Sequence, residues 1–99
     1  MSRRHTKLKV DGNQAEIIRA IEAVGGKCQD LASVGSGCPD VLASFRNKMY
    51  LIEIKNPEKQ ESKRRKLDES QVKWHEKWQA PVHVVETVDE VLKLIGATR

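Results

Sequence analysis

The stretches Val41-Leu-Ala-Ser-Phe45 and Met49-Tyr-Leu-Ile-Glu-Ile-Lys55 decide the fold of this chain. Both are rich in β-branched and aromatic residues, and the short polar segment Arg46-Asn47-Lys48 separates them, so the sequence predicts an antiparallel β-hairpin. If the turn is centred between the first two residues of that segment, the register places Asp40 directly opposite Glu53. A shift by one residue would send Asp40 to the other face of the sheet.

This register would bring together groups that suit metal-assisted chemistry on phosphates. Directly opposed residues share a face with Cβ atoms roughly 4.5–5.5 Å apart, so Asp40 and Glu53 could hold one cation. Lys55 follows Glu53 by two residues and is predicted to lie on the same face. Mg²⁺ binds one or two carboxylates and completes its shell with water and phosphate oxygens, and a nearby lysine can orient or deprotonate the attacking water. The alternative is a structural salt bridge at the strand edge, between Glu53 and Lys55 or from Lys55 across to Asp40.

A helix is predicted from Asn13 to Val24, because apolar residues recur at helical spacing and two glycines follow. Ile17, Ile21 and Val24 are expected to form its buried stripe. Asn13 and Glu16 also fit a capping box, which gives Glu16 a purely structural explanation. Glu16 and Glu22 both border the apolar arc of the helix, so periodicity does not select between them as a site residue.

A second capping box, from Asp68 to Gln71, predicts a helix that ends near Gln79. Trp74 and Trp78 of this helix are expected in the core, and His75 is expected to be a hydrogen-bonded core histidine rather than a catalytic base. The remaining predicted elements are a strand at Lys27–Leu31, a loop at Gly35–Gly37 that either approaches a phosphate or simply connects strands, a buried strand at Pro81–Val85 and a helix at Val88–Ile95. The predicted order is αβββαβα, an α/β fold with a mixed central sheet flanked by helices.

The pattern resembles the PD-(D/E)xK nuclease superfamily, and five ordered blocks narrow the resemblance to the VRR-NUC family, as a stand-alone member of phage type. The blocks are Asp11-Gly-Asn-Gln-Ala-Glu16-Ile-Ile, Gly35-Ser-Gly-Cys-Pro-Asp40, Leu51-Ile-Glu-Ile-Lys55, Lys66-Leu-Asp-Glu-Ser-Gln71-Val-Lys-Trp-His75 and Pro81-Val-His-Val-Val85. The resemblance covers the chain from about Asp11 onwards. It implies a domain at residues 11–99 behind a basic tail at residues 1–10.

The resemblance also implies a metal-dependent nuclease that uses Mg²⁺ or Mn²⁺. By position in the family motifs, Lys55 is expected to be catalytic together with the two carboxylates, and Gln71 is expected to support the site. The metal is expected to be surrounded by Glu16, Asp40, Glu53 and the main-chain carbonyl of Ile54.

Charge is distributed unevenly along the 99 residues, whose net charge is +4. Basic residues gather before residue 10 and again between residues 55 and 66, where six lysines and arginines stand against two glutamates. Such runs are usually solvated, but one of them directly follows the predicted active strand, which favours phosphate binding. The candidate DNA-binding residues are Arg3, Arg4, Lys59, Lys63, Arg64, Arg65 and Lys66.

Composition and length limit the function classes. A chain of this length forms one modest core, and no apolar run approaches the ~20 residues that span a membrane, so a cytoplasmic protein (bacterial, or phage-encoded and acting in the host) is expected. The predicted function is a structure-specific DNA endonuclease that resolves Holliday junctions as a homodimer. The alternatives are a flap-type nuclease and a DNA-binding module without catalytic activity.

Overall fold

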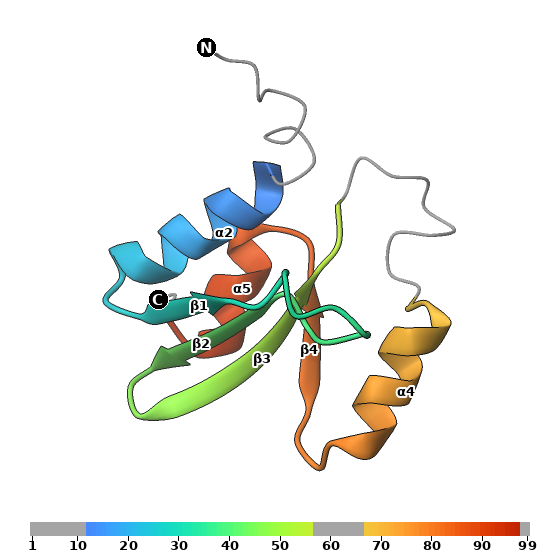
Figure 1. Cartoon of the computed structure of the whole chain (residues 1–99). Helices are drawn as coiled ribbons and strands as arrows, with labels where there is room; N and C mark the ends of the chain where they lie inside the picture. Colours follow the sequence, from blue (N-terminus) through green and yellow to red (C-terminus); the bar gives the residue numbers. More distant parts are fainter. Residues whose placement is uncertain (1–11, 57–66, 98–99) are drawn as a thin grey trace.

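The computed structural model describes residues 12–56 and 67–97 and confirms the predicted α/β order (Figure 1). The basic tail predicted at residues 1–10 lies outside the described residues. The elements are α2 (Gly12–Ala23), β1 (Lys27–Asp30), β2 (Val41–Phe45), β3 (Lys48–Ile54), α4 (Glu69–Lys77), β4 (Val82–Val85) and α5 (Val88–Ile95).

The four strands form one mixed sheet in the order β1-β2-β3-β4. Short connections make β1, β2 and β3 antiparallel neighbours, whereas the connection through α4 returns the chain so that β4 runs parallel to β3. Helices α2 and α5 pack together on one face of the sheet, and α4 lies apart from them beside β4 (Figure 1). One face of the sheet is therefore covered by α2 and α5, whereas α4 does not take part in that cover.

The β2–β3 hairpin has the predicted register, with Val41 paired to Ile52. Its turn residues Arg46 and Asn47 have φ values of 52° and 68°, the left-handed pair that a two-residue type I′ turn requires. Asparagine tolerates the left-handed conformation. The guanidinium of Arg46 lies over the ring of Phe45, 4.8 Å from its centroid, in a cation–π contact. The even loop length keeps Asp40 and Glu53 on one face.

The core lies between the sheet and the pair α2 and α5. Alternate residues of β2 enter it, because successive side chains of a strand point to opposite faces. Residues spaced by four on each helix meet them, and burial of each such aliphatic side chain contributes about 1.5–3 kcal/mol. The core consists of Ile17, Ile21, Val41, Ala43, Phe45, Ile52, Val85, Val91 and Ile95.

Two predictions for the first helix are wrong. Because α2 begins at Gly12, Asn13 lies inside the helix and does not cap it; its Nδ2 instead donates to the main-chain oxygen of Lys55 at 2.9 Å. Val24 is 39% exposed and not part of the core. The helix ends at Ala23, and the turn that follows carries Val24 away from the buried stripe.

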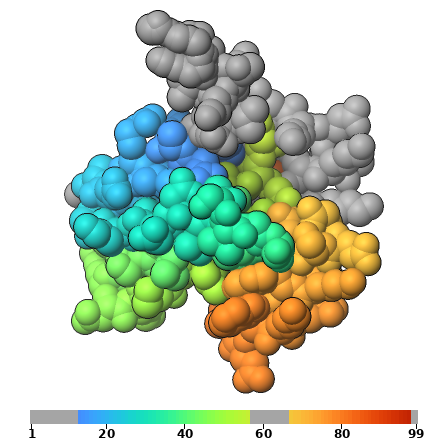
Figure 2. Space-filling view, viewed as in Figure 1, coloured from blue at the N-terminus to red at the C-terminus, as the bar shows by residue number. Residues whose placement is uncertain are grey.

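Helix α4 has the predicted capping box but not the predicted burial. The Asp68 side chain accepts from the backbone N–H of Gln71, and the Gln71 side chain accepts from the backbone N–H of Asp68. No residue of α4 is buried, so the prediction that its tryptophans belong to the core is wrong. The rings of Trp74 and Trp78 stack on each other at 4.9 Å, and Trp78 is 54% exposed, because α4 lies at one side of the molecule (Figure 2).

The last strand and helix follow the prediction with one correction. Strand β4 begins at Val82 and only Val85 is buried, since β4 is an edge strand with a neighbour on one side. Helix α5 starts at its N-cap Thr87 and ends at Gly96, which has φ of 80° and donates to the last carbonyls of the helix. None of the helices within residues 12–56 and 67–97 is long and apolar enough to span a membrane.

Gly37 is needed where the loop after β1 meets the first turn of α4. Its φ is 85°, and a Cβ there would run into the backbone carbonyl of Ser70. Close packing of the loop onto α4 thus explains this glycine, and an approach of the loop to phosphate stays a prediction. Gly35 also has positive φ, at 76°, but a Cβ there meets nothing within 4 Å.

Replacement of either glycine by alanine separates backbone strain from packing. Both variants place alanine at positive φ, which costs roughly 1–2 kcal/mol. Gly37→Ala should lose measurably more unfolding free energy than Gly35→Ala in urea titrations, because the loop must also move away from α4. Equal losses in the two variants would show that the contact with Ser70 is not tight in solution.

Candidate active site

The candidate site begins where β2 and β3 approach α4. Val41 and Ile52 point into the core, so their chain neighbours Asp40 and Glu53 lie on the opposite face of the sheet. The backbone N–H of Ile54 donates to Oδ2 of Asp40 at 2.7 Å. This bond holds the Asp40 carboxylate against the strand that carries Glu53.

Glu53 is 3% exposed, which is unusual for a carboxylate. Its Oε2 accepts from Nε2 of Gln71 at 2.6 Å and lies 3.6 Å from Nζ of Lys55. Its Oε1 is buried and has no hydrogen-bond partner among the residues the structure describes. A buried carboxylate oxygen without a partner is costly, and a cation would offset that cost.

Burial and the neighbouring carboxylates shift the pKa values of two side chains in the site. The pKa of Glu53 is raised to about 7, first by burial and then by the charge of Asp40, while Lys55 and Gln71 oppose the shift. Burial together with the same two carboxylates also raises the pKa of the Cys38 thiol. Without a bound metal Cys38 is therefore protonated at neutral pH, which does not favour nucleophilic attack by its sulfur.

Lys55 is held at both its side chain and its backbone. Its Nζ donates to Oε1 of Gln71 at 3.2 Å, and the side chain is 16% exposed. Its backbone N–H donates to the oxygen of Val85 at 2.9 Å, and its carbonyl accepts from Asn13. Sequence reasoning missed Asn13 as a residue that ties α2 to the site, because an asparagine near a helix start is first interpreted as a cap.

Four of the residues expected from the sequence are thus gathered, namely Asp40, Glu53, Lys55 and Gln71. Glu16 lies exposed on α2, and within the described ranges no three His, Cys, Asp or Glu side chains form a group able to hold a metal ion. The ligand roles of Glu16 and of the Ile54 carbonyl stay predictions. Glu86, directly after β4, is a further buried carboxylate that sequence reasoning missed. Its position immediately after a predicted strand is the signal that could have indicated it.

His75 lies one helical turn beyond Gln71. It is half-buried, its ring meets Trp74 edge-on at 6.3 Å, and its Nε2 is buried without a hydrogen-bond partner in the described part of the chain. The prediction of a hydrogen-bonded core histidine is therefore wrong for this nitrogen. No contact of His75 with the four gathered residues supports a catalytic role.

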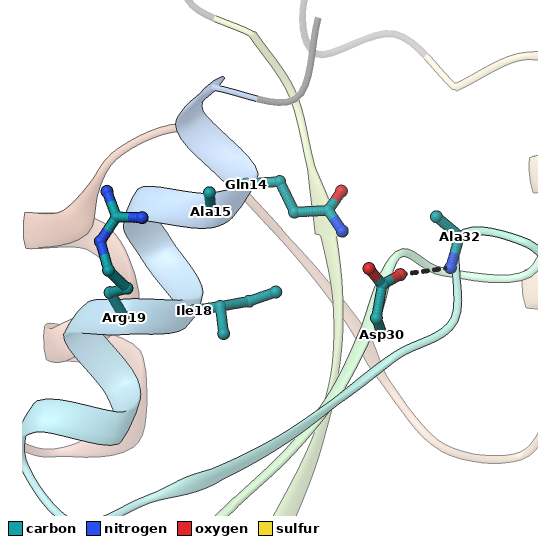
Figure 3. A pocket seen from close by; sticks show the side chains of 6 residues that line it. All are labelled: Gln14, Ala15, Ile18, Arg19, Asp30 and Ala32. Atoms are coloured by element: carbon teal, nitrogen blue, oxygen red, sulfur yellow. Dashed lines mark hydrogen bonds between the residues drawn. The ribbon is translucent and has the colours of Figure 1, made fainter. Parts of the chain in front are cut away.

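A hollow of about 320 Å³ lies between α2 and the end of β1 (Figure 3). The side chain of Gln14 extends across it toward Asp30, whose Oδ1 accepts from the N–H of Ala32 at 2.8 Å. The hollow contains none of the gathered residues and is not the candidate site. Its lining residues are Gln14, Ala15, Ile18, Arg19, Asp30 and Ala32.

The candidate DNA-binding residues Arg3, Arg4, Lys59, Lys63, Arg64, Arg65 and Lys66 lie outside the described residues. Their role stays a prediction from the sequence.

Comparison with known proteins connects this geometry to a family. No family model and no curated protein matches the chain. A solved structure described as a VRR_NUC domain is similar to it, with a TM-score of 0.62 and 29% sequence identity over 87% of this chain and 92% of that one. This similarity supports membership of the chain in the VRR-NUC family. The chain has an α/β fold consistent with the VRR_NUC and PD-(D/E)xK-like fold, which suggests a nuclease domain that uses divalent metal.

The raised pKa of Glu53 predicts how stability depends on pH in the absence of metal. The folded-state pKa of about 7 lies above the ordinary value of 4.5, so the protonated form stabilises the fold below pH 4.5, and this contribution is lost as pH rises through 7. The loss between acidic and alkaline pH is at most about 3.5 kcal/mol, at about 1.4 kcal/mol per pKa unit.

Glu53→Gln should therefore show a smaller fall in unfolding free energy than the wild-type protein when chelator-treated samples are compared between about pH 5 and about pH 8. Titrating groups away from the site are common to both proteins and cancel in the comparison, so the difference reports Glu53 together with its coupled neighbours Asp40 and Lys55. Identical pH dependence in the two proteins would show that the Glu53 carboxylate is not buried as described.

Proposed function

We propose that this VRR-NUC domain is a Mg²⁺- or Mn²⁺-dependent endodeoxyribonuclease, and that it resolves four-way DNA junctions as a homodimer. The observation that carries the nuclease proposal is the pair of adjacent carboxylates, Asp40 and Glu53, with Lys55 and Gln71 in contact with the second of them. A coupled carboxylate pair with a perturbed pKa and a neighbouring lysine is typical of a catalytic site rather than of a structural salt bridge.

The residues present fit a divalent metal. Glu53 has a buried oxygen without a partner in the described part of the chain, and its raised pKa reflects first its burial and then the nearby Asp40 carboxylate, both of which a cation would offset. Oxygen donors are those that Mg²⁺ and Mn²⁺ prefer. Asp40 and Glu53 would hold the ion with the Ile54 carbonyl, and Glu16 is proposed as the fourth protein ligand. When bound, the metal activates water and neutralises charge on the phosphate.

The protein's own groups then have distinct tasks in phosphodiester hydrolysis. The water loses a proton and its oxygen forms a bond to phosphorus, while the bond to one bridging oxygen breaks and that leaving oxygen takes up a proton from solvent. Lys55 orients the water and stabilises the charge that gathers on the phosphate oxygens. Gln71 holds Glu53 and Lys55 at a fixed separation, because one amide contacts both.

DNA binding is proposed to rest on the basic residues near the start of the chain and after β3. Backbone contacts of this kind bind DNA by charge and position it without reading sequence. A domain of 99 residues offers little surface for reading bases, which favours recognition of a branched shape. The proposed contacts are Arg3, Arg4, Lys59, Lys63, Arg64, Arg65 and Lys66.

The homodimer proposal rests on the family resemblance, on the symmetry of junction resolution and on exposed apolar side chains of this chain. Symmetric resolution of a junction needs two cuts, and a two-fold dimer supplies two equivalent sites. Trp78 and Met49 are 54% and 65% exposed, so apolar side chains are available for contact with a second copy.

Asp40→Asn and Glu53→Gln should each abolish cleavage of DNA in the presence of Mg²⁺, while DNA binding is kept or strengthened because a negative charge near phosphate is removed. Calorimetric titration with Mn²⁺ should show much weaker binding in both variants. Glu76→Gln, at an exposed position on α4, is the matched control and should cleave like the wild-type protein. Full cleavage by either site variant would refute the assignment.

Light scattering at micromolar concentration should report about twice the 11.2 kDa mass of the chain. On a junction extruded as a cruciform in a supercoiled plasmid, a dimer should place paired nicks within one encounter and release linear DNA. A monomer that makes single nicks and prefers a flap substrate would favour the flap-type alternative. Tight binding to every substrate with no cleavage would favour a DNA-binding module.

A further inference from the structure

The first turn of α4 provides the described contacts between this helix and the candidate site. No residue of α4 is buried, so the hydrophobic core does not fix its position. Ser70 packs its carbonyl against Gly37, and Gln71 reaches Glu53 and Lys55. The local geometry of this turn therefore determines where the Gln71 amide lies.

The orientation of that amide is fixed by its partners. Its Oε1 accepts from the backbone N–H of Asp68 at 3.0 Å and from Nζ of Lys55 at 3.2 Å, and its Nε2 donates to Glu53 at 2.6 Å. A backbone N–H and an ammonium group can only donate, and an ionised carboxylate can only accept. A flipped amide would lose all three bonds, so the N–H of Asp68 helps to select the orientation that serves the site.

The side chain of Asp68 holds this N–H in place. Its Oδ1 accepts from the backbone N–H of Gln71 at 2.9 Å and from Oγ of Ser70 at 2.8 Å. Asp68 has φ of −80° and ψ of 175°, the extended geometry of an N-cap residue. A capping box normally stabilises only its helix, but here the glutamine side chain of the box is also the one that contacts Glu53 and Lys55.

We propose that Asp68 is a positioning residue of the nuclease site, which acts through Gln71 to hold Glu53 and Lys55 in their working geometry. This inference rests on the proposed function. In this role Asp68 does not itself contact the substrate. Loss of a group that orients residues around a metal site typically lowers activity roughly 10- to 100-fold.

The chain offers a matched control at the other capped helix. The hydroxyl of Thr87 accepts from the backbone N–H of Glu90 at 3.1 Å and caps α5, at a position that is not part of the Asp68–Gln71–Glu53 network. Asp68→Ala and Thr87→Ala thus remove caps of the same kind, and only the first removes a contact of the proposed network. Asp68→Asn keeps an oxygen acceptor and a good cap, and it serves as the conservative rescue.

The experiment combines cleavage kinetics with a readout that needs no activity. In Mg²⁺, at a temperature where all variants are folded, Asp68→Ala should lower kcat roughly 10- to 100-fold with little change in KM, while Asp68→Asn and Thr87→Ala stay near wild type. In metal-free protein, the side-chain amide signals of Gln71 in ¹⁵N NMR spectra should shift and exchange faster with solvent in Asp68→Ala, but not in Thr87→Ala.

Equal losses of kcat in Asp68→Ala and Thr87→Ala would overturn the inference, since Asp68 would then act only through helix stability. Unchanged Gln71 amide signals in Asp68→Ala would also overturn it, whatever the activity. If wild-type protein cleaves no DNA while those signals respond as expected, the proposed function fails and the link from Asp68 to Gln71 stands.

Discussion

The Glu53 carboxylate lies between β3 and the first turn of α4, almost excluded from water, with Asp40 as a close negative neighbour. A charge in that position is unfavourable unless other groups compensate it, and the surrounding structure supplies them. Gln71 donates to one oxygen and Lys55 brings a positive charge to the same oxygen. The other oxygen has no partner in the described part of the chain, which leaves a place suited to a divalent cation.

The two faces of the sheet have different roles, since one packs against the core and the other carries the candidate site. One face carries the core and packs on α2 and α5, so apolar burial on that face holds the hydrogen-bonded strands in place. The other face carries Asp40, Glu53 and Lys55, whose positions follow from those of their buried neighbours by the alternation of side chains along a strand. A substitution at the site can therefore change charge and hydrogen bonding while the core that defines the fold is kept.

Helix α4 has a different relation to the fold from the other two helices. It buries no side chain, and its first turn meets the site through Gln71 and the loop through Gly37. Such a helix is positioned by a few polar contacts, so changes at its capping box should reach the site more readily than changes at the cap of α5. The similarity to a solved VRR_NUC domain extends over most of both chains and includes the sheet that carries the candidate site.

The sequence by itself determined the order of the elements, the hairpin register and the capping box of α4, because these depend on local spacing and turn length. Alternation in β2 and an even turn sufficed to place Asp40 and Glu53 on one face. Only the tertiary structure decided that Asn13 binds the Lys55 carbonyl instead of capping α2, and that Trp74 and Trp78 stack outside the core. These outcomes depend on how far each helix lies from the sheet, and periodicity within one helix carries no information about that distance.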